Sequence, residues 1–128
     1  MAIQIVRLGT KRKSEEGLRI GTVRRPPRGV PKSEYAVQNW FDVWLPNVSP
    51  SAKLMKIGQA VETDIDWSVF VKKYRKEMTA PEKERILDLL AALSHTSNFS
   101  VGCYCNNEER CHRSVLRNLF EERGAQLK

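Results

Sequence analysis

The chain has few cysteines, and they do not form the pattern of a disulfide-stapled domain. It holds three cysteines in 128 residues, an odd number, whereas small secreted domains pair their cysteines to support a limited core. No apolar run approaches the roughly 20 residues of a membrane-spanning helix. At the N-terminus the apolar residues precede the basic ones, the reverse of the order in a secretory signal. We therefore expect a cytoplasmic protein with no membrane partner.

The chain is also short of acidic side chains. Its 15 aspartates and glutamates stand against 22 lysines and arginines, which leaves a formal net charge of +7. A basic balance favours anionic partners such as phosphates, nucleotides or nucleic acid. With 41% hydrophobic and 29% charged residues, the composition is that of a folded protein. We expect residues 1–128 to form one domain.

Hydrophobic patterns predict strands near both ends of the chain, with helices between and after them. The predicted strands cover residues 2–8, 18–23 and 98–104. Apolar residues at helical spacing predict helices that begin near Tyr35, Ser49, Asp66 and Thr79, and a last one that runs through Val115. The first of these rests on the spacing of Val37, Trp40, Phe41 and Trp44. This order predicts a single-domain α/β fold with a small, mostly parallel sheet packed by helices.

Rare and reactive side chains gather in one stretch, CYCNNEERCHRS, at residues 103–114. It lies where the last predicted strand enters the last helix, and ligands of open α/β sheets bind beyond the carboxyl ends of strands. On that helix His112 falls on the apolar face that contains Leu116, and Cys111 lies beside it. We therefore expect Cys103, Cys111 and His112 to converge at the end of the strand.

Several cysteine chemistries do not fit this stretch. It has no C-x-x-C redox motif, and neither Cys103 nor Cys105 has the arginine six positions later that a phosphatase loop would need. A zinc site has four candidate ligands, with Cys111 and His112 among them. Neighbouring residues on a helix, however, diverge by about 100 degrees, which makes one tetrahedron difficult. We expect no metal and no other cofactor.

An anion pocket with a reactive thiol is the remaining interpretation. A helix N-terminus offers free backbone N–H groups, and a thiol beside it and near cationic groups has a lowered pKa. Cys111, beside His112 and Arg113, should then be more reactive than Cys105 in its loop. For each residue taken alone, an ordinary structural role is the simpler interpretation: cysteine as a small buried hydrophobe, His112 as a core histidine, and Arg113 paired with Glu109 four residues earlier. The clustering of these rare residue types is what indicates a site.

The sequence resembles the family called domain of unknown function 488, which includes YeaO-like proteins. That family has a cysteine after a strand and, eight residues later, a Cys-His-Arg that leads into a helix, and the matching positions here are Cys103, Cys111, His112 and Arg113. A second segment, VRRPPRGVPK, resembles the family's Arg-x-x-Pro-Arg-Gly loop through Arg24, Pro27, Arg28, Gly29 and Lys32. The resemblance implies a site built from both segments.

Two hypotheses follow, and the sequence leaves open whether the protein is an enzyme. In the first, the domain binds a phosphate-bearing small molecule or nucleotide through Arg24, Arg28 and Arg113, and a thiol acts on it, with Cys103, Cys111 and His112 as the catalytic candidates. In the second, the protein is a non-catalytic module that binds nucleic acid weakly and nonspecifically through its basic surface. A purely structural role for the cysteines is the third interpretation.

Overall fold

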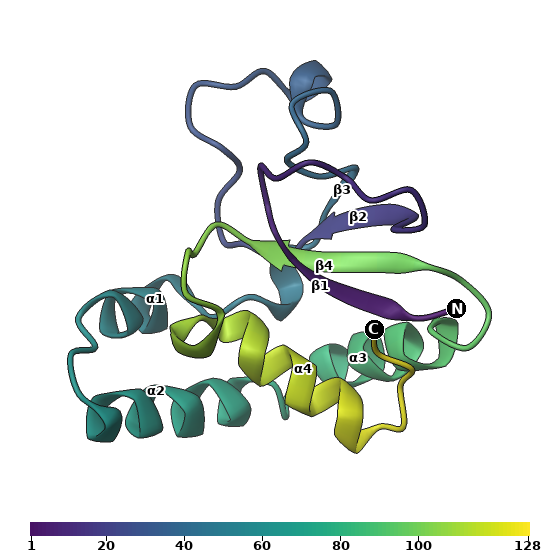
Figure 1. The fold of residues 1–128 in the computed structure, drawn as a ribbon. Coiled ribbons are helices and arrows are strands. Elements are labelled where there is room, and N and C mark those ends of the chain that lie inside the picture. Colours follow the sequence, from purple (N-terminus) through teal and green to yellow (C-terminus); the bar gives the residue numbers. More distant parts are fainter.

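The computed structural model describes the backbone of residues 1–128 and every side chain except that of Glu108. In this described part, one all-parallel sheet has the strand order β1-β4-β2-β3, formed by β1 (Ile3–Arg7), β2 (Leu18–Gly21), β3 (Val43–Trp44) and β4 (Phe99–Cys103). The helices lie together below the sheet in Figure 1: α1 (Ala52–Gln59), α2 (Asp64–Glu77), α3 (Pro81–Leu93) and α4 (His112–Glu122). Short 3₁₀ turns occupy η1 (Lys32–Glu34), η2 (Pro46–Val48) and η3 (Glu108–Arg110). The predicted α/β fold with a parallel sheet is confirmed.

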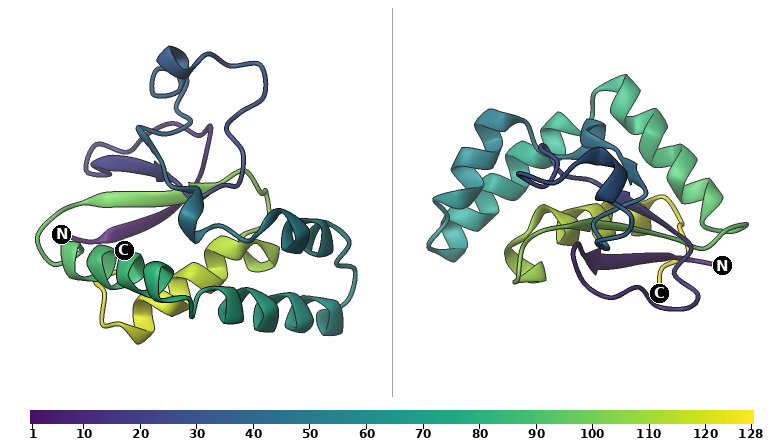
Figure 2. Two further views of the ribbon diagram at one scale, coloured as in Figure 1. Left: turned by 180° about the vertical axis from the view of Figure 1, so that it is seen from behind. Right: turned by 90° about the horizontal axis from the view of Figure 1, so that it is seen from above.

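The central strand β4 brings distant segments of the chain together. It pairs with β1 on one side and with β2 on the other, in registers that set Phe99 opposite both Ile3 and Leu18. Because the three strands are parallel, their carboxyl ends lie at one edge of the sheet. The segments that leave this edge, 8–17, 22–42 and 104–111, therefore meet there, and Figure 2 shows the long middle one rising away from the helices.

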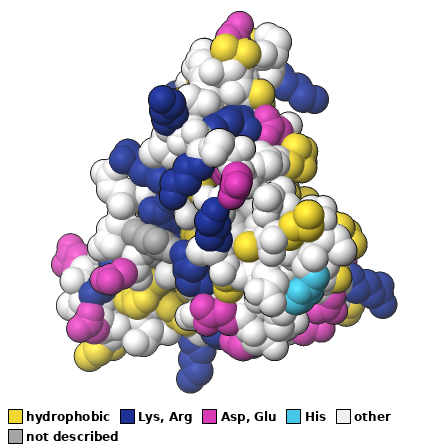
Figure 3. Space-filling view, turned by 45° about the vertical axis from the view of Figure 1, so that its right-hand side comes forward, with side chains coloured by type: hydrophobic (Ala, Val, Ile, Leu, Met, Phe, Trp, Pro, Cys, Tyr) yellow, Lys and Arg dark blue, Asp and Glu magenta, His cyan; other side chains and the backbone are white. Residues whose placement is uncertain are grey.

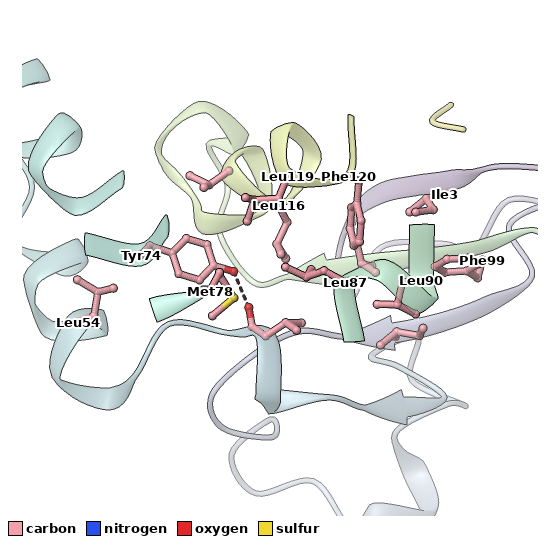
Figure 4. Close-up of a cluster of buried hydrophobic side chains, with 14 of the residues drawn as sticks. Ile3, Leu54, Tyr74, Met78, Leu87, Leu90, Phe99, Leu116, Leu119 and Phe120 are labelled. Atoms are coloured by element: carbon pink, nitrogen blue, oxygen red, sulfur yellow. Dashed lines mark hydrogen bonds between the residues drawn. The ribbon is translucent and has the colours of Figure 1, made fainter. Parts of the chain in front are cut away.

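The main core lies between the sheet and the helices. Phe99 and Val101 of β4 alternate with Ser100, so they contact the helices while Ser100 points to the opposite face. Helix α4 supplies a continuous apolar stripe that includes Leu116 and Phe120, both fully buried. Figure 4 shows this cluster, in which the Tyr74 hydroxyl donates a 2.5 Å hydrogen bond to a backbone carbonyl of η2. None of the helices in the described chain has the length and apolar character needed to cross a bilayer.

A buried ion pair supports the opposite face of the sheet. Arg19 of β2 donates from Nε and Nη2 to the Glu16 carboxylate, and both side chains are essentially inaccessible. Its Nη1 donates to the carbonyls of Thr10 and Asn39, 2.8 and 2.7 Å away. Burial alone would raise the pKa of Glu16, but hydrogen bonds and the Arg19 charge outweigh it, so this pKa lies below its ordinary value. One guanidinium thus ties two loops to the sheet.

The prediction of a helix that begins near Tyr35 is wrong. Residues 35–39 form turns, residues 40–42 are irregular, and the chain then adds the short edge strand β3. Asn39 has a φ of 64°, which interrupts any helix, and its carbonyl is captured by Arg19. The aromatic residues are spaced to pack in a second small core rather than along a helix. Phe41 packs near Cys103, and Tyr35 contacts Phe41 edge-on.

We predict that Glu16→Gln lowers the free energy of unfolding by about 3–5 kcal/mol, because the Arg19 charge would remain buried without its counter-charge. Urea denaturation measures the change. Glu15→Gln is the matched control, since it removes the same charge from an exposed side chain and should cost less than about 1 kcal/mol. Equal, small losses for the two variants would contradict the structural role of the pair.

Candidate functional site

Three reactive side chains meet at the carboxyl edge of the sheet. Cys103 is the last residue of β4, Cys111 is the N-cap of α4, and His112 is the first helical residue. Their potential ligand atoms all lie within 4.8 Å of one another, and the side chains are 1%, 2% and 4% exposed. The expected convergence of these residues is therefore present in the structure.

The backbone at Cys111 explains how two neighbouring residues face one point. Its φ and ψ of −122° and 148° are extended rather than helical. The divergence of about 100 degrees between helical neighbours therefore does not apply to Cys111 and His112. These two side chains can approach the same point, which helical spacing alone did not predict. Arg117 follows Cys111 at the six-residue spacing of a phosphatase loop, which the sequence reasoning overlooked, but the intervening residues 112–116 are helical and do not form such a loop.

Cys103 and Cys111 are paired as a disulfide across a Cα–Cα distance of 7.8 Å. They belong to a small second core with Leu8, Val23 and Phe41. This apolar shell limits the access of water to both sulfurs. The pair therefore links the end of the central strand directly to the start of the last helix.

The imidazole of His112 is held in a defined orientation. Its Nε2 lies 2.7 Å from the carbonyl oxygen of Thr22, and its Nδ1 lies 3.9 Å from the sulfur of Cys111. Because a carbonyl only accepts hydrogen bonds, the proton is on Nε2, and the Nδ1 lone pair faces the sulfurs. Burial, helped by the nearby Arg113 charge, lowers the pKa of His112 to about 4. The ring is thus neutral near neutral pH.

A cavity of about 550 Å³ opens beside this cluster. Cys103 and His112 form part of its wall, and the cationic side chains Arg24, Arg25 and Lys56 form another part. Arg24 is fixed by its Nε, which donates to the carbonyl of Pro50 at 3.0 Å, and by its Nη2 on two further carbonyls. The cavity therefore combines a sulfur, a neutral imidazole and fixed positive charge.

The sulfurs are not placed as the sequence predicts. Cys111, which was expected to be the more reactive thiol, is buried and does not line the cavity, whereas Cys103 does. Cys105 also lines the cavity and is the exposed free cysteine. Burial of its sulfur raises the pKa of Cys105, partly offset by the Arg113 charge. Cys103 is thus the member of the pair that contributes to the cavity wall, while both cysteines of the pair are buried.

The three arginines expected to bind an anion occupy separate places. Only Arg24 lines the cavity of the cysteine–histidine cluster. Arg113 is 4% exposed and donates from Nη2 to the carbonyl of Cys105 at 2.9 Å, so it holds a loop that lines the cavity. Arg28 lines a neighbouring cavity of about 570 Å³. Arg25, which sequence reasoning missed, lines both cavities; its position beside Arg24 in the family-like loop was the available signal.

The neighbouring cavity has aromatic as well as cationic walls. Trp40 and Tyr104 meet edge-on with ring centroids 5.8 Å apart, and Arg7 lines the cavity with them. The Tyr104 hydroxyl donates to the backbone carbonyl of Arg25, which joins the wall shared by the two cavities. In Figure 3 lysine and arginine side chains form a band down one face of the molecule.

The structure is an α/β domain with a parallel sheet and with a cavity and reactive side chains at the carboxyl edge of that sheet. The chain belongs to the DUF488-N3a family, described as the active DUF488-N3 subclade, whose family model matches residues 3–124. The family assignment expected from the Cys-His-Arg segment is confirmed. No curated protein and no solved structure matches the chain.

We predict that the stability of the protein falls by about 1.5 kcal/mol between about pH 6.5 and pH 5 because of His112. In this window the unfolded chain binds a proton at His112, whereas the folded protein, with a pKa of about 4, does not. Urea denaturation across the window measures the effect. His112→Gln should abolish the His112 contribution and His95→Gln should preserve it; an unchanged slope in His112→Gln would contradict the assignment.

We also predict the order in which the cysteines react with iodoacetamide. The native protein should be alkylated at Cys105 alone, because the other two sulfurs are paired and buried. Labelling of Cys103 and Cys111 should require a reductant. Peptide mass spectrometry gives the order, and Cys105→Ser, as the control, should show almost no native labelling. Alkylation of Cys111 ahead of Cys105 in the native protein would contradict this order.

Proposed function

We propose that this protein binds a nucleotide or a similar phosphate-bearing small molecule at the carboxyl edge of its sheet and brings it against the sulfur of Cys103. The observation that carries the proposal is one cavity wall that holds Cys103 and His112 together with the cationic groups of Arg24 and Arg25. Arginine suits phosphate because its planar guanidinium donates two parallel hydrogen bonds.

The charges of the cavity are available to a ligand. Among the described residues, the Arg25 side chain has no hydrogen-bond or ion-pair partner, and Nη1 of Arg24 is likewise unoccupied. Among the side chains that the structure describes, no carboxylate lines this cavity. A bound phosphate would therefore meet preorganised positive charge, with Arg24 already fixed by three carbonyl oxygens.

The neighbouring cavity supports a nucleotide as the ligand class. Bases stack on aromatic side chains, and each such contact contributes about 1–3 kcal/mol to binding. Trp40 and Tyr104 offer aromatic surfaces of this kind. Arg25 lines both cavities. A nucleotide with its phosphate near Arg25 would reach the sulfur on one side and the aromatic rings on the other.

Chemistry at sulfur is the reaction type that this arrangement favours. Cys103 contributes to the cavity wall, and Cys111 is its partner sulfur. His112 is neutral with its Nδ1 toward the sulfurs, so it can accept a hydrogen bond from a thiol when the pair is reduced. The family's description as an active subclade agrees with an enzyme.

The test of ligand binding compares two arginine variants. A nucleoside 5′-monophosphate should bind to the native protein more tightly than the nucleoside alone, measured by calorimetry. Arg25→Ala should weaken binding at least about tenfold, the loss of one charged hydrogen bond. Arg85→Ala, which removes the same charge from the exposed face of α3, should leave it unchanged. Equal affinity in both variants would contradict the proposal.

A second candidate, nonspecific nucleic-acid binding, is favoured by the band of basic side chains in Figure 3. Such binding depends on counterion release, so its affinity for duplex DNA falls by about 0.9 log unit per log unit of salt for each phosphate contacted. It would also weaken to a similar extent in Arg25→Ala and Arg85→Ala. Salt-sensitive binding of duplex DNA, with no binding of mononucleotides, would favour this candidate.

A further inference from the structure

We propose that Cys103, Cys111 and His112, when the cysteines are reduced, form a zinc site with one coordination position open to the cavity. The ligand atoms of the three residues lie within 4.8 Å of one another, and all three side chains are buried. Two thiolates and one imidazole are a ligand set that Zn²⁺ accepts in catalytic sites. This inference deepens the proposed function, but binding of the metal does not depend on binding of a nucleotide.

The histidine is oriented as a metal ligand. Metal-binding imidazoles commonly donate their second ring N–H to a carbonyl or carboxylate, which fixes the tautomer and aims the other nitrogen. Here Nε2 donates to Thr22, and Nδ1 faces the sulfurs. Ligands at about 2.0 and 2.3 Å from one tetrahedral ion lie about 3.5 Å apart. The observed distance of 3.9 Å from Nδ1 to the sulfur of Cys111 is close to this value.

The cysteine backbones also suit a shared ion. Cysteines joined by a disulfide usually have Cα atoms about 4.4–6.8 Å apart, whereas Cys103 and Cys111 are separated by 7.8 Å. On reduction the sulfurs would part to about 3.8 Å, the distance between two sulfurs on one tetrahedral zinc. The extended backbone at Cys111 lets the neighbouring thiolate and imidazole serve the same ion.

A small-molecule thiol is the reductant in the reaction that creates the metal site. Two thiol molecules reduce the bridge and leave as one small-molecule disulfide, while Cys103 and Cys111 each gain a proton. Binding of Zn²⁺ then releases these two protons to solvent. Two thiolates neutralise the charge of the ion, which makes the complex suitable for a buried position. The bridged and the metal-bound forms are thus alternative states of one pair.

The open position would face the ligand cavity. Cys103 and His112 line that cavity, whereas Cys111 lies behind them. A fourth ligand therefore has one side from which to approach, between the two lining residues and near Arg24. A zinc ion there would polarise a phosphate oxygen or lower the pKa of bound water toward about 7.

Cobalt provides the test, because Co²⁺ can occupy a zinc site and, unlike Zn²⁺, absorbs visible light. Reduced protein titrated with Co²⁺ without oxygen should bind one ion per chain, with the absorption bands of four-coordinate cobalt and thiolate charge transfer, and Zn²⁺ should abolish them. Cys103→Ser and Cys111→Ser should each weaken binding at least about tenfold. Cys105→Ser, the matched control, should bind normally. Absence of cobalt binding by the reduced native protein, or its loss in Cys105→Ser, would overturn the proposal.

A thiol count keeps the test valid if a variant fails to fold. In the reduced wild-type protein loaded with Zn²⁺, iodoacetamide should modify Cys105 while Cys103 and Cys111 stay protected. Equal alkylation of these two with and without Zn²⁺ in the reduced protein would also overturn the site. Nucleotide binding is measured separately on protein treated with a chelator. Failure of the metal site and failure of the nucleotide proposal are therefore distinguishable.

Discussion

The hydrogen bond from His112 to the carbonyl of Thr22 links helix α4 to the two strands that end beside the cavity. Thr22 follows β2 and is itself bonded through its amide and hydroxyl to the carbonyl of Gly102 in β4. The imidazole thus connects the first turn of α4 to the two strands that end beside the cavity. Because the ring is buried, loss of this bond would leave a polar group without a partner in an apolar setting, at a cost of about 1–3 kcal/mol. The same bond directs Nδ1 toward the sulfurs, so one contact determines both packing and chemistry.

A second constraint acts from the opposite face of the sheet. The Arg19 guanidinium holds the carbonyls of Thr10 and Asn39, and Thr10 and Trp40 line the cavity that contains Arg28. The buried ion pair with Glu16 therefore fixes walls of the aromatic cavity rather than only the core. A network with its donors and acceptors satisfied specifies one arrangement, whereas a partly satisfied one would destabilise the fold.

Local patterns predicted much of this architecture. The strands rich in β-branched residues and the position of CYCNNEERCHRS between a strand and a helix were sufficient to predict that Cys103, Cys111 and His112 meet. Aromatic spacing from Tyr35 onward was misleading, because those rings pack on a loop-built core and the backbone reverses at Asn39. That outcome depends on Arg19, whose contacts cross about twenty positions of sequence.

The details of the site depended on conformations that residue types do not determine. The residue types around Cys111 do not specify an extended N-cap backbone. This conformation nevertheless allows Cys111 and His112 to face one metal ion. The division of the arginines is of the same kind. Arg113 donates to the carbonyl of Cys105. Arg24 lines the cavity of the cysteine–histidine cluster, Arg28 lines the neighbouring cavity, and Arg25 lines both. Only the loop geometry after β2 decides between these positions.

The most direct test of the account is a crystal structure of the protein with a bound nucleoside 5′-monophosphate. The central claim is that one cavity holds the phosphate beside the sulfur of Cys103. The account predicts phosphate density in contact with Arg24 and Arg25 and within reach of that sulfur, with the base against Trp40 or Tyr104. A nucleotide bound elsewhere on the basic band, with the cysteine–histidine cavity filled only by solvent, would contradict it.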